Sequence, residues 1–325
     1  MIVQRAFNGR FPVSRLTMTK LQLRLGTRAS ALARWQAHWV ASQLADGDLE
    51  IELIPMTTRG DITDRDPIGN IGSPGVFTKE LQRALIDGQI DLAVHSLKDL
   101  PTDAVEGLVL AAVPERENTF DALISRHGES FEDLPPGAAI GTGSLRRRAQ
   151  LLHARGDLQM RDIRGNVDTR LQKLTAGQYD AIVLAYAGLK RLGLEQQITQ
   201  ILEPEFVLPA VGQGALAIET RLDDSATRQA LAVLNHLPTH QAVTAERTLL
   251  AALAGGCLAP IGAWARPQDQ TLRLDAVVLS ADGKQRISAW GVANPDEAAE
   301  LGAKVAGELI AQGASALIQQ ARHPT

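Results

Sequence analysis

The sequence predicts two parallel α/β domains followed by a small α+β domain. With 325 residues, the chain is too long for one ordinary core. Strand-like apolar runs alternate with helical patterns up to about residue 220, which is typical of parallel sheets. The remaining part combines a hairpin with helices. The contents of 45% hydrophobic and 22% charged residues are typical of a globular protein.

The first domain shows an alternation of strands and helices. Its predicted elements are, in order, a strand at 21–25, a turn at 26–28, a helix to Leu44, a strand at 51–56, a helix at 76–88 and a buried strand at 90–101. Leu32, Trp35 and Trp39 follow helical spacing, and Gly88 is a typical helix end. The polar run 57–75 is too long for a routine connection and indicates a functional loop.

The pattern restarts at about residue 120. The next predicted elements are a strand at 120–125, three strand-and-helix units at 138–156, 158–177 and 179–193, and a strand at 206–219 that returns to the first domain. The tail is predicted to form a helix at 243–256, a hairpin at 272–291 around Asp282-Gly283, and a helix at 295–313.

These patterns set the predicted domain limits. They are 1–20 for a disordered extension, 21–114 with 215–232 for domain 1, 120–208 for domain 2, and 236–325 for domain 3. Seven basic residues precede the first acidic residue, Asp46. That imbalance also fits a targeting peptide, but no apolar signal core follows it.

Composition excludes several classes of protein. The net charge of −4, from 33 Lys and Arg against 37 Asp and Glu, argues against a protein that coats nucleic acid. No apolar run is long enough to span a membrane. One cysteine cannot form an internal disulfide, and no Cys/His cluster suggests a metal, so we expect a metal-free cytoplasmic protein.

Arginines follow the predicted strands, where open α/β sheets bind anions. Arg28 follows the first strand. Ser144 is the predicted N-cap of a helix whose first turn holds Arg146, Arg147 and Arg148. Cations there oppose the helix dipole by about 0.3–1 kcal/mol each, which indicates an anionic ligand. Because successive helical positions turn by about 100°, we expect Arg148 to point away from the site.

The same arrangement recurs later in the chain. Arg164 precedes and Arg170 lies within the next predicted helix, and Arg191 follows another strand-helix pair. Arginine favours bidentate recognition of carboxylates or phosphates, and the sequence does not separate these two ligands. A single arginine of this kind is usually a solvated surface residue, so the prediction rests on the repetition.

Three further residues are interpreted from their neighbours in the sequence. Asp99 follows Lys98 at the end of a strand among these cations, where a carboxylate is costly unless it meets positive charge in the ligand. His95, next to an apolar strand, is predicted to be structural. Cys257 follows Gly255-Gly256, which would expose its sulfur, although a lone cysteine is most often a small buried hydrophobe.

The motifs carrying these residues resemble those of the porphobilinogen deaminase family. In order they are LGTRASALARWQ, TRGD, FTKEL, VHSLKDLP, GTGSLRR, RGNVDTRLQKL, YDAIVLAYAGLKRLGL, LPAVGQGALAIE, LDD, VTAER and GGCLAPIGAWA. The resemblance covers residues 21 to about 320. It implies three domains, the first two being a pair like those of periplasmic binding proteins.

The resemblance also implies an activity. Four porphobilinogen molecules lose ammonia in turn and join a dipyrromethane primer held by Cys257 through a thioether, and hydroxymethylbilane is then released by hydrolysis. Asp99 matches the catalytic aspartate, which stabilises positive charge and relays protons, with Lys98 beside it. The implied cofactor-binding residues are Cys257, Arg28, Ser30, Lys98, Thr142, Ser144, Arg146, Arg147, Arg164 and Gly165. The implied substrate-binding residues are Arg28, Phe77, Arg164, Arg170, Arg191 and Gln213.

The chain departs from the family pattern at four positions. They are Asn70 and Pro74, where lysines are common, Asp168, where glycine is common, and Gly143, where serine is frequent. We expect a monomer whose partner is the small-molecule substrate. Two other functions are compatible with parts of the pattern. One is a non-catalytic anion-binding or sensor protein with the same cleft. The other is a phosphoribosyl or nucleotide transferase, which would need a phosphate loop that the sequence lacks.

Overall fold

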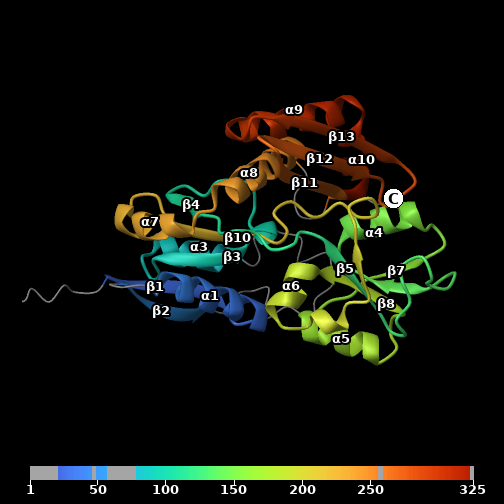
Figure 1. The fold of residues 1–325 in the computed structure, drawn as a ribbon, viewed down its shortest axis with the longest axis horizontal. Coiled ribbons are helices and arrows are strands. Elements are labelled where there is room, and N and C mark those ends of the chain that lie inside the picture. Colours follow the sequence, from blue (N-terminus) through green and yellow to red (C-terminus); the bar gives the residue numbers. More distant parts are fainter. Residues whose placement is uncertain (1–20, 46–48, 57–77, 255–258, 323–325) are drawn as a thin grey trace, which may run out of the picture.

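The computed structural model describes residues 21–45, 49–56, 78–254 and 259–322. This part of the chain forms two five-stranded sheets and one three-stranded sheet, each covered by helices (Figure 1). The predicted α/β class with a small C-terminal α+β part is therefore confirmed. The extension 1–20 and the predicted loop 57–75 lie outside the described residues. Within the described part of the chain, no helix is both long and apolar enough to cross a membrane.

The first sheet has the strand order β2-β1-β3-β10-β4. Its strands are β1 (Leu21–Arg28), β2 (Leu49–Met56), β3 (Leu92–Ser96), β4 (Leu108–Ala112) and β10 (Leu216–Arg221). Helix α1 (Ala31–Leu44) buries Ala37 and Val40 against one face, and α3 (Lys79–Ile86) buries Leu81 and Leu85 against the other. Helix α7 (Ser225–Leu231) lies beside β4 (Figure 1).

The second sheet has the equivalent order β7-β6-β8-β5-β9. Its strands are β5 (Asp121–Ser125), β6 (Ala139–Gly141), β7 (Gln159–Arg161), β8 (Ala181–Ala185) and β9 (Gln200–Leu202). Its helices are α4 (Leu145–Ala154), α5 (Val167–Thr175) and α6 (Tyr186–Arg191). Apolar clusters lie on both faces, with Leu151 of α4 on one side and Leu174 of α5 on the other.

Each five-stranded sheet contains one antiparallel strand, which the predicted parallel pattern did not include. The first residue of β10, Leu216, pairs with the last residue of β3, Ser96. In the same way Asp121, at the start of β5, pairs with Ala185 at the end of β8. The chain enters each of these strands after crossing from the other sheet, so it arrives at the carboxyl ends of the neighbouring strands and runs back against them.

The sequence prediction of the return strand was right in place and too long in extent. Residues 206–219 were predicted as one strand, whereas β10 covers Leu216–Arg221. The preceding residues form the second crossover, the segment that leads from β9 of the second sheet to β10 of the first. In it, Gly212 and Gly214 have φ values of 71° and 85°. Because a left-handed backbone of this kind interrupts strand geometry, the regular pairing begins only after Gly214.

The C-terminal unit is an antiparallel sheet covered on one face by helices. Its elements are β11 (Ile261–Gln268), β12 (Thr271–Leu279), β13 (Arg286–Ala293), α8 (Leu237–Ala252), α9 (Ala298–Ala311) and α10 (Ala314–Arg322). The predicted hairpin around Asp282-Gly283 is confirmed, while β11 and α10 were not predicted. Gly283 packs against α4, where its carbonyl lies 2.8 Å from His153 Nδ1, so this unit contacts the second sheet's helices.

Candidate active site

A cavity of about 490 Å³ lies where the three units meet. Its wall includes the turn that follows β3, the start of α4, the second crossover and the end of α8. Five basic and two acidic side chains line it: Lys98, Arg146, Arg147, Arg247 and Arg322, with Asp99 and Asp103. The excess of basic groups makes the cavity attractive to an anionic ligand.

The first turn of α4 brings two of these arginines into the site. The Ser144 hydroxyl accepts a hydrogen bond from the Arg147 N–H at 3.4 Å, which confirms its predicted role as N-cap. Arg146 and Arg147 are 4% and 6% exposed. Arg148 points away, as predicted, and forms an ion pair with Asp162 at 2.7 Å on the surface.

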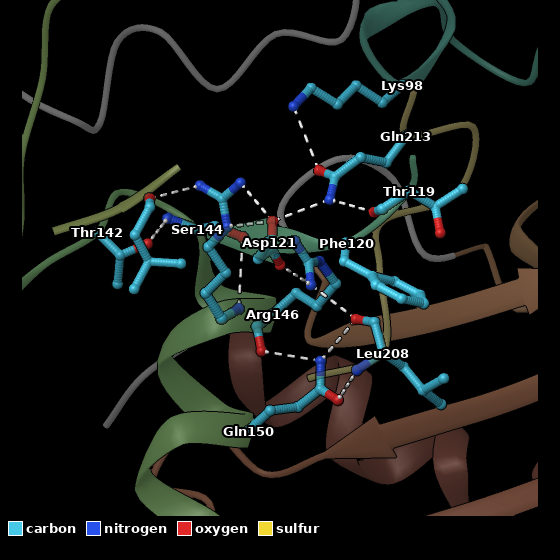
Figure 2. Close-up of polar contacts among 12 residues, drawn as sticks. Lys98, Thr119, Phe120, Asp121, Thr142, Ser144, Arg146, Gln150, Leu208 and Gln213 are labelled. Carbon is cyan, nitrogen blue, oxygen red and sulfur yellow. Dashed lines mark hydrogen bonds and ion pairs between the residues drawn. The ribbon is translucent and has the colours of Figure 1, made fainter. Parts of the chain in front are cut away.

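The two buried arginines share the carboxylate of Asp121, which is 0% exposed. Figure 2 shows this carboxylate among its partners. Arg147 donates to Asp121 Oδ1 from Nε at 3.0 Å and from Nη2 at 2.7 Å. Arg146 Nη1 lies 2.8 Å from Oδ2 and also donates to the Leu208 carbonyl at 2.6 Å. Although burial opposes ionisation, Arg146 and Arg147 hold the pKa of Asp121 well below its usual range.

This carboxylate modifies the argument from the helix dipole. The sequence predicted that the basic first turn of α4 requires an anionic ligand. The structure provides an anion of the protein itself, Asp121, so the basic turn alone does not establish a ligand. What indicates a ligand is the excess of cations that remains around the cavity.

Gln213 connects Asp121 to Lys98, as Figure 2 shows. Its amide nitrogen donates to Asp121 Oδ1 at 2.8 Å and to the Thr119 carbonyl at 2.7 Å. Its amide oxygen accepts from Lys98 Nζ at 3.3 Å. Burial, together with the nearby charge of Arg147, lowers the pKa of Lys98 to about 8.

Asp99 and the surroundings of the cysteine meet at the same cavity. Asp99 ends a short 3-10 turn that directly follows β3, and its half-buried side chain lines the cavity. Ala254 and Ala259 line it as well. Cys257 falls between these two alanines, at 255–258, outside the described residues.

Seven of the predicted site residues lie in the described part but do not line this cavity. They are Arg28, Ser30, Thr142, Arg164, Gly165, Arg170 and Arg191. Ser30 caps α1, since its hydroxyl accepts from the Ala33 N–H at 3.3 Å. The Gly165 carbonyl accepts from Arg170 Nε at 2.7 Å. Phe77 lies outside the described residues.

Arg191 lies between the two α/β units. Its Nη2 donates to the Gly214 carbonyl at 2.6 Å, and its guanidinium carbon is 5.8 Å from the centre of the Trp35 ring of α1. Burial lowers its pKa to about 10. His95, which was predicted to be structural, is buried beside Glu219, with 3.2 Å between Nε2 and Oε2.

Two of the four departures from the family pattern have a structural setting. A Cβ at Gly143 would lie 3.1 Å from the Ile163 carbonyl oxygen, which leaves little room for a side chain. Asp168 lies in the first turn of α5, where a carboxylate is favoured by the helix dipole. Asn70 and Pro74 lie outside the described residues.

Four charged residues of this region were not predicted from the sequence. Asp121 makes the most contacts, and Asp103, Arg247 and Arg322 line the cavity. A signal for Asp121 was present, because it opens a predicted strand, but its partners are 26 and 92 residues away in the chain. Such long-range pairs cannot be read from local spacing.

Comparison with known families agrees with this arrangement. The family model described as porphobilinogen deaminase, dipyromethane cofactor binding domain, matches residues 23–229, and that of the C-terminal domain matches residues 240–311. A porphobilinogen deaminase of Chlorobium chlorochromatii (strain CaD3) is 48% identical over 309 residues, which is 93% of this chain and 99% of the relative. The chain belongs to the porphobilinogen deaminase family. The resemblance in its motifs is thereby confirmed.

Membership of this family gives the chain its activity. The protein is a transferase of tetrapyrrole biosynthesis, a hydroxymethylbilane synthase that acts on porphobilinogen and uses a dipyrromethane cofactor. The cavity fits such a cofactor, because pyrrole acetate and propionate groups are carboxylates and basic side chains dominate the wall.

Some solved structures show a more distant likeness. The methionine-binding protein MetQ is 15% identical, with 68% of this chain and 90% of that chain covered and a TM-score of 0.42. The periplasmic sulfonate-binding protein SsuA from Methylobacillus flagellatus KT is 13% identical, with coverages of 73% and 69% and a TM-score of 0.39. At these values the likeness carries no argument, and the fold class rests on the sheets described above.

Proposed function

We propose that the cavity between the three units is where this enzyme holds its cofactor and extends the pyrrole chain. One observation carries the proposal. Ala254 and Ala259, which border the segment containing Cys257, line the same cavity as Asp99 and Lys98. A primer attached to Cys257 would therefore begin beside the proposed catalytic carboxylate.

We assign the buried arginines to the carboxylates of the cofactor. Arg146 and Arg147 are fixed by Asp121 and need little rearrangement when they meet an anion. The Ser144 hydroxyl is close to them as the helix cap. Arg28, Ser30, Thr142, Arg164 and Gly165 extend the proposed cofactor set, and Arg28, Phe77, Arg164, Arg170, Arg191 and Gln213 form the proposed substrate set. The cofactor, when bound, supplies the pyrrole carbon to which the first substrate is joined.

Asp99 is proposed to stabilise positive charge on the reacting pyrroles. Loss of ammonia from porphobilinogen leaves a cationic centre, and a carboxylate fixed nearby lowers the energy of that charge. The 3-10 turn after β3 holds Asp99 in the cavity wall beside Lys98. A carboxylate there can also accept the proton that leaves the newly joined pyrrole.

The proposal includes the oligomeric state, the domain limits and the cellular compartment. We infer a monomer, with domains 21–114 plus 215–232, 120–208 and 236–325. A reducing compartment such as the cytoplasm is supported by the single cysteine among 325 residues.

The intact mass of the purified protein under denaturing conditions tests the anchor. We expect a mass greater than that of the sequence by two linked pyrrole units, located on the peptide that contains Cys257, and no addition in Cys257→Ala. If the unsubstituted protein carries no added mass and gains none after incubation with porphobilinogen, the result would favour a non-catalytic anion-binding protein. An active Cys257→Ala protein without cofactor would overturn the anchor role.

Two variants of the cavity wall test Asp99. Asp99→Asn should keep the fold and lose turnover by on the order of 10²-fold or more, as expected for removal of a preorganised charge. Asp103→Asn is the matched control, since Asp103 lines the same cavity but is exposed. Turnover near that of the parent in Asp99→Asn, or an equal loss in both variants, would contradict the assignment.

A further inference from the structure

In the proposed function, the buried carboxylate of Asp121 appears only as the partner of Arg146 and Arg147. Asp121 is 0% exposed and does not line the cavity, so a ligand in the cavity does not reach its carboxylate directly. It opens β5, the strand that the first crossover inserts into the second sheet. Its neighbour in that sheet is the last residue of β8, Ala185.

Both oxygens of this carboxylate are used by groups that do line the cavity. Oδ1 accepts from Arg147 Nε and Nη2 and from Gln213 Nε2, at 3.0, 2.7 and 2.8 Å. Oδ2 lies 2.8 Å from Arg146 Nη1. Asp121 is therefore in direct contact with two cations and one amide of the cavity wall.

The amide of Gln213 extends this contact to the first unit. Its nitrogen has two acceptors, Asp121 Oδ1 and the Thr119 carbonyl, which fixes the orientation of the amide group. Its oxygen is thereby presented to Lys98 Nζ at 3.3 Å. An acceptor in this position favours the ammonium form of Lys98, because neutral lysine is a weaker donor.

We propose that Asp121 is a positioning residue, a buried counter-ion shared by the cations of both α/β units. It holds Arg146 and Arg147 of α4 directly and orients Lys98 of the first unit through Gln213 (Figure 2). The inference rests on the proposed function, in which these cations bind the carboxylates of the pyrrole chain.

The cluster around Asp121 keeps a net positive charge. Three cations share one buried carboxylate, so positive charge remains for a ligand. The pKa of Lys98 is lowered to about 8 because burial and the charges of Arg147 and Arg146 outweigh the charges of Asp99 and Asp121, which raise it. The other charged groups of the cavity wall are Asp103, Arg247 and Arg322. Loss of the Asp121 charge should therefore release the proton of Lys98 at a lower pH.

The first test is the pH dependence of Lys98 acetylation by trace acetic anhydride in the full-length protein, followed on the Lys98 peptide. We expect a midpoint of about 8 in the parent. In Asp121→Asn it should fall by roughly one pH unit. Asp162→Asn is the control, because it removes the surface partner of Arg148 on the same helix. It should leave the midpoint and the activity unchanged.

The second readout is the fraction of protein that carries the primer, measured by intact mass after incubation with porphobilinogen. We expect Asp121→Asn to reduce that fraction about tenfold, since Arg146 and Arg147 lose their fixed position. Failure of the parent to gain any mass would count against the anchor proposed at Cys257. The acetylation midpoint would still test Asp121.

A second variant covers the case in which Asp121→Asn does not fold. Gln213→Met keeps the length of the side chain and all charges but removes the link to Lys98. A lower Lys98 midpoint in this variant supports the proposal. An unchanged midpoint in folded Asp121→Asn or in Gln213→Met, or an equal shift in Asp162→Asn, would overturn it.

Discussion

The inserted strands β5 and β10 occupy equivalent places in the two five-stranded sheets, but their buried carboxylates have different partners. Asp121 of β5 contacts two guanidinium groups, from Arg146 and Arg147, at 2.8 and 2.7 Å. Glu219 of β10 lies 3.2 Å from His95 Nε2 and accepts from Gln82 Nε2 at 3.0 Å. Both carboxylates follow a crossover, yet only the partners of Asp121 line the cavity.

The difference shows how one strand plan supports two kinds of buried polar group. Arginine remains charged at any physiological pH, so Asp121 has permanent counter-ions and the cations remain near the cavity. The partners of Glu219 are an imidazole and an amide, neither of which is a permanent cation. The arrangement around Asp121 suits a binding site for carboxylates, and the arrangement around Glu219 suits the interior of a sheet. The following predictions test this comparison.

The largest expected effect is that of Asp121→Ala. It leaves two buried arginines without their carboxylate, which we expect to lower the free energy of unfolding by about 3–5 kcal/mol. Urea unfolding at neutral pH measures the change. If Asp121→Ala lowered the free energy of unfolding by less than Glu219→Ala does, the two carboxylates would not differ as their partners suggest.

The pH dependence of stability tests the lowered pKa of Lys98, the cation that the first α/β unit contributes to the cluster. The pKa of Lys98 is about 8 in the folded protein and 10.5 in its ordinary state. Between these values the unfolded chain binds more protons, so stability should rise with pH, by up to about 3 kcal/mol from this group. Urea unfolding between pH 8 and 10 should show a smaller rise in Lys98→Met. An identical rise in both proteins would exclude Lys98 as its source.

Glu219→Gln should have a smaller effect than Asp121→Ala. Glutamine keeps an oxygen that can accept from the amide of Gln82, so one of the two contacts of Glu219 is retained. We expect a loss of about 1 kcal/mol, the size of one altered buried hydrogen bond, with little change in turnover. Thermal unfolding and a turnover assay measure both. A large loss of turnover would link this buried group to the active site.

Arg148→Ala should have the smallest effect. Arg148 pairs with Asp162 at 2.7 Å, but both side chains are partly exposed, at 33% and 47%. Exposed ion pairs contribute about 0–1 kcal/mol, so stability and primer content should hardly change. Arg146→Ala, two residues earlier on the same helix, should by contrast reduce primer content. Equal effects in these two variants would contradict the conclusion that Arg146 serves the cavity whereas Arg148 lies on the surface.

Local sequence signals predicted caps and turns better than the directions of strands. Ser144 at the start of α4 and Gly283 in the hairpin turn were predicted because a cap and a turn depend on near neighbours in the chain. The strands β4, β9 and β11 were missed. In β4 most side chains are only partly buried, and β11 lies within a motif that was used for the family resemblance.

The sequence by itself determined the family, the α/β class and the clustering of cations after the strands. It also predicted that Arg148 points away, because a helix turns by a constant angle at each residue. Only the tertiary structure decided that β5 and β10 run against their neighbours. It also decided that Asp121, 26 residues from Arg147 and 92 from Gln213, joins both units. Backbone conformation follows from neighbours in the chain, whereas a shared counter-ion depends on which strand ends the crossovers bring together.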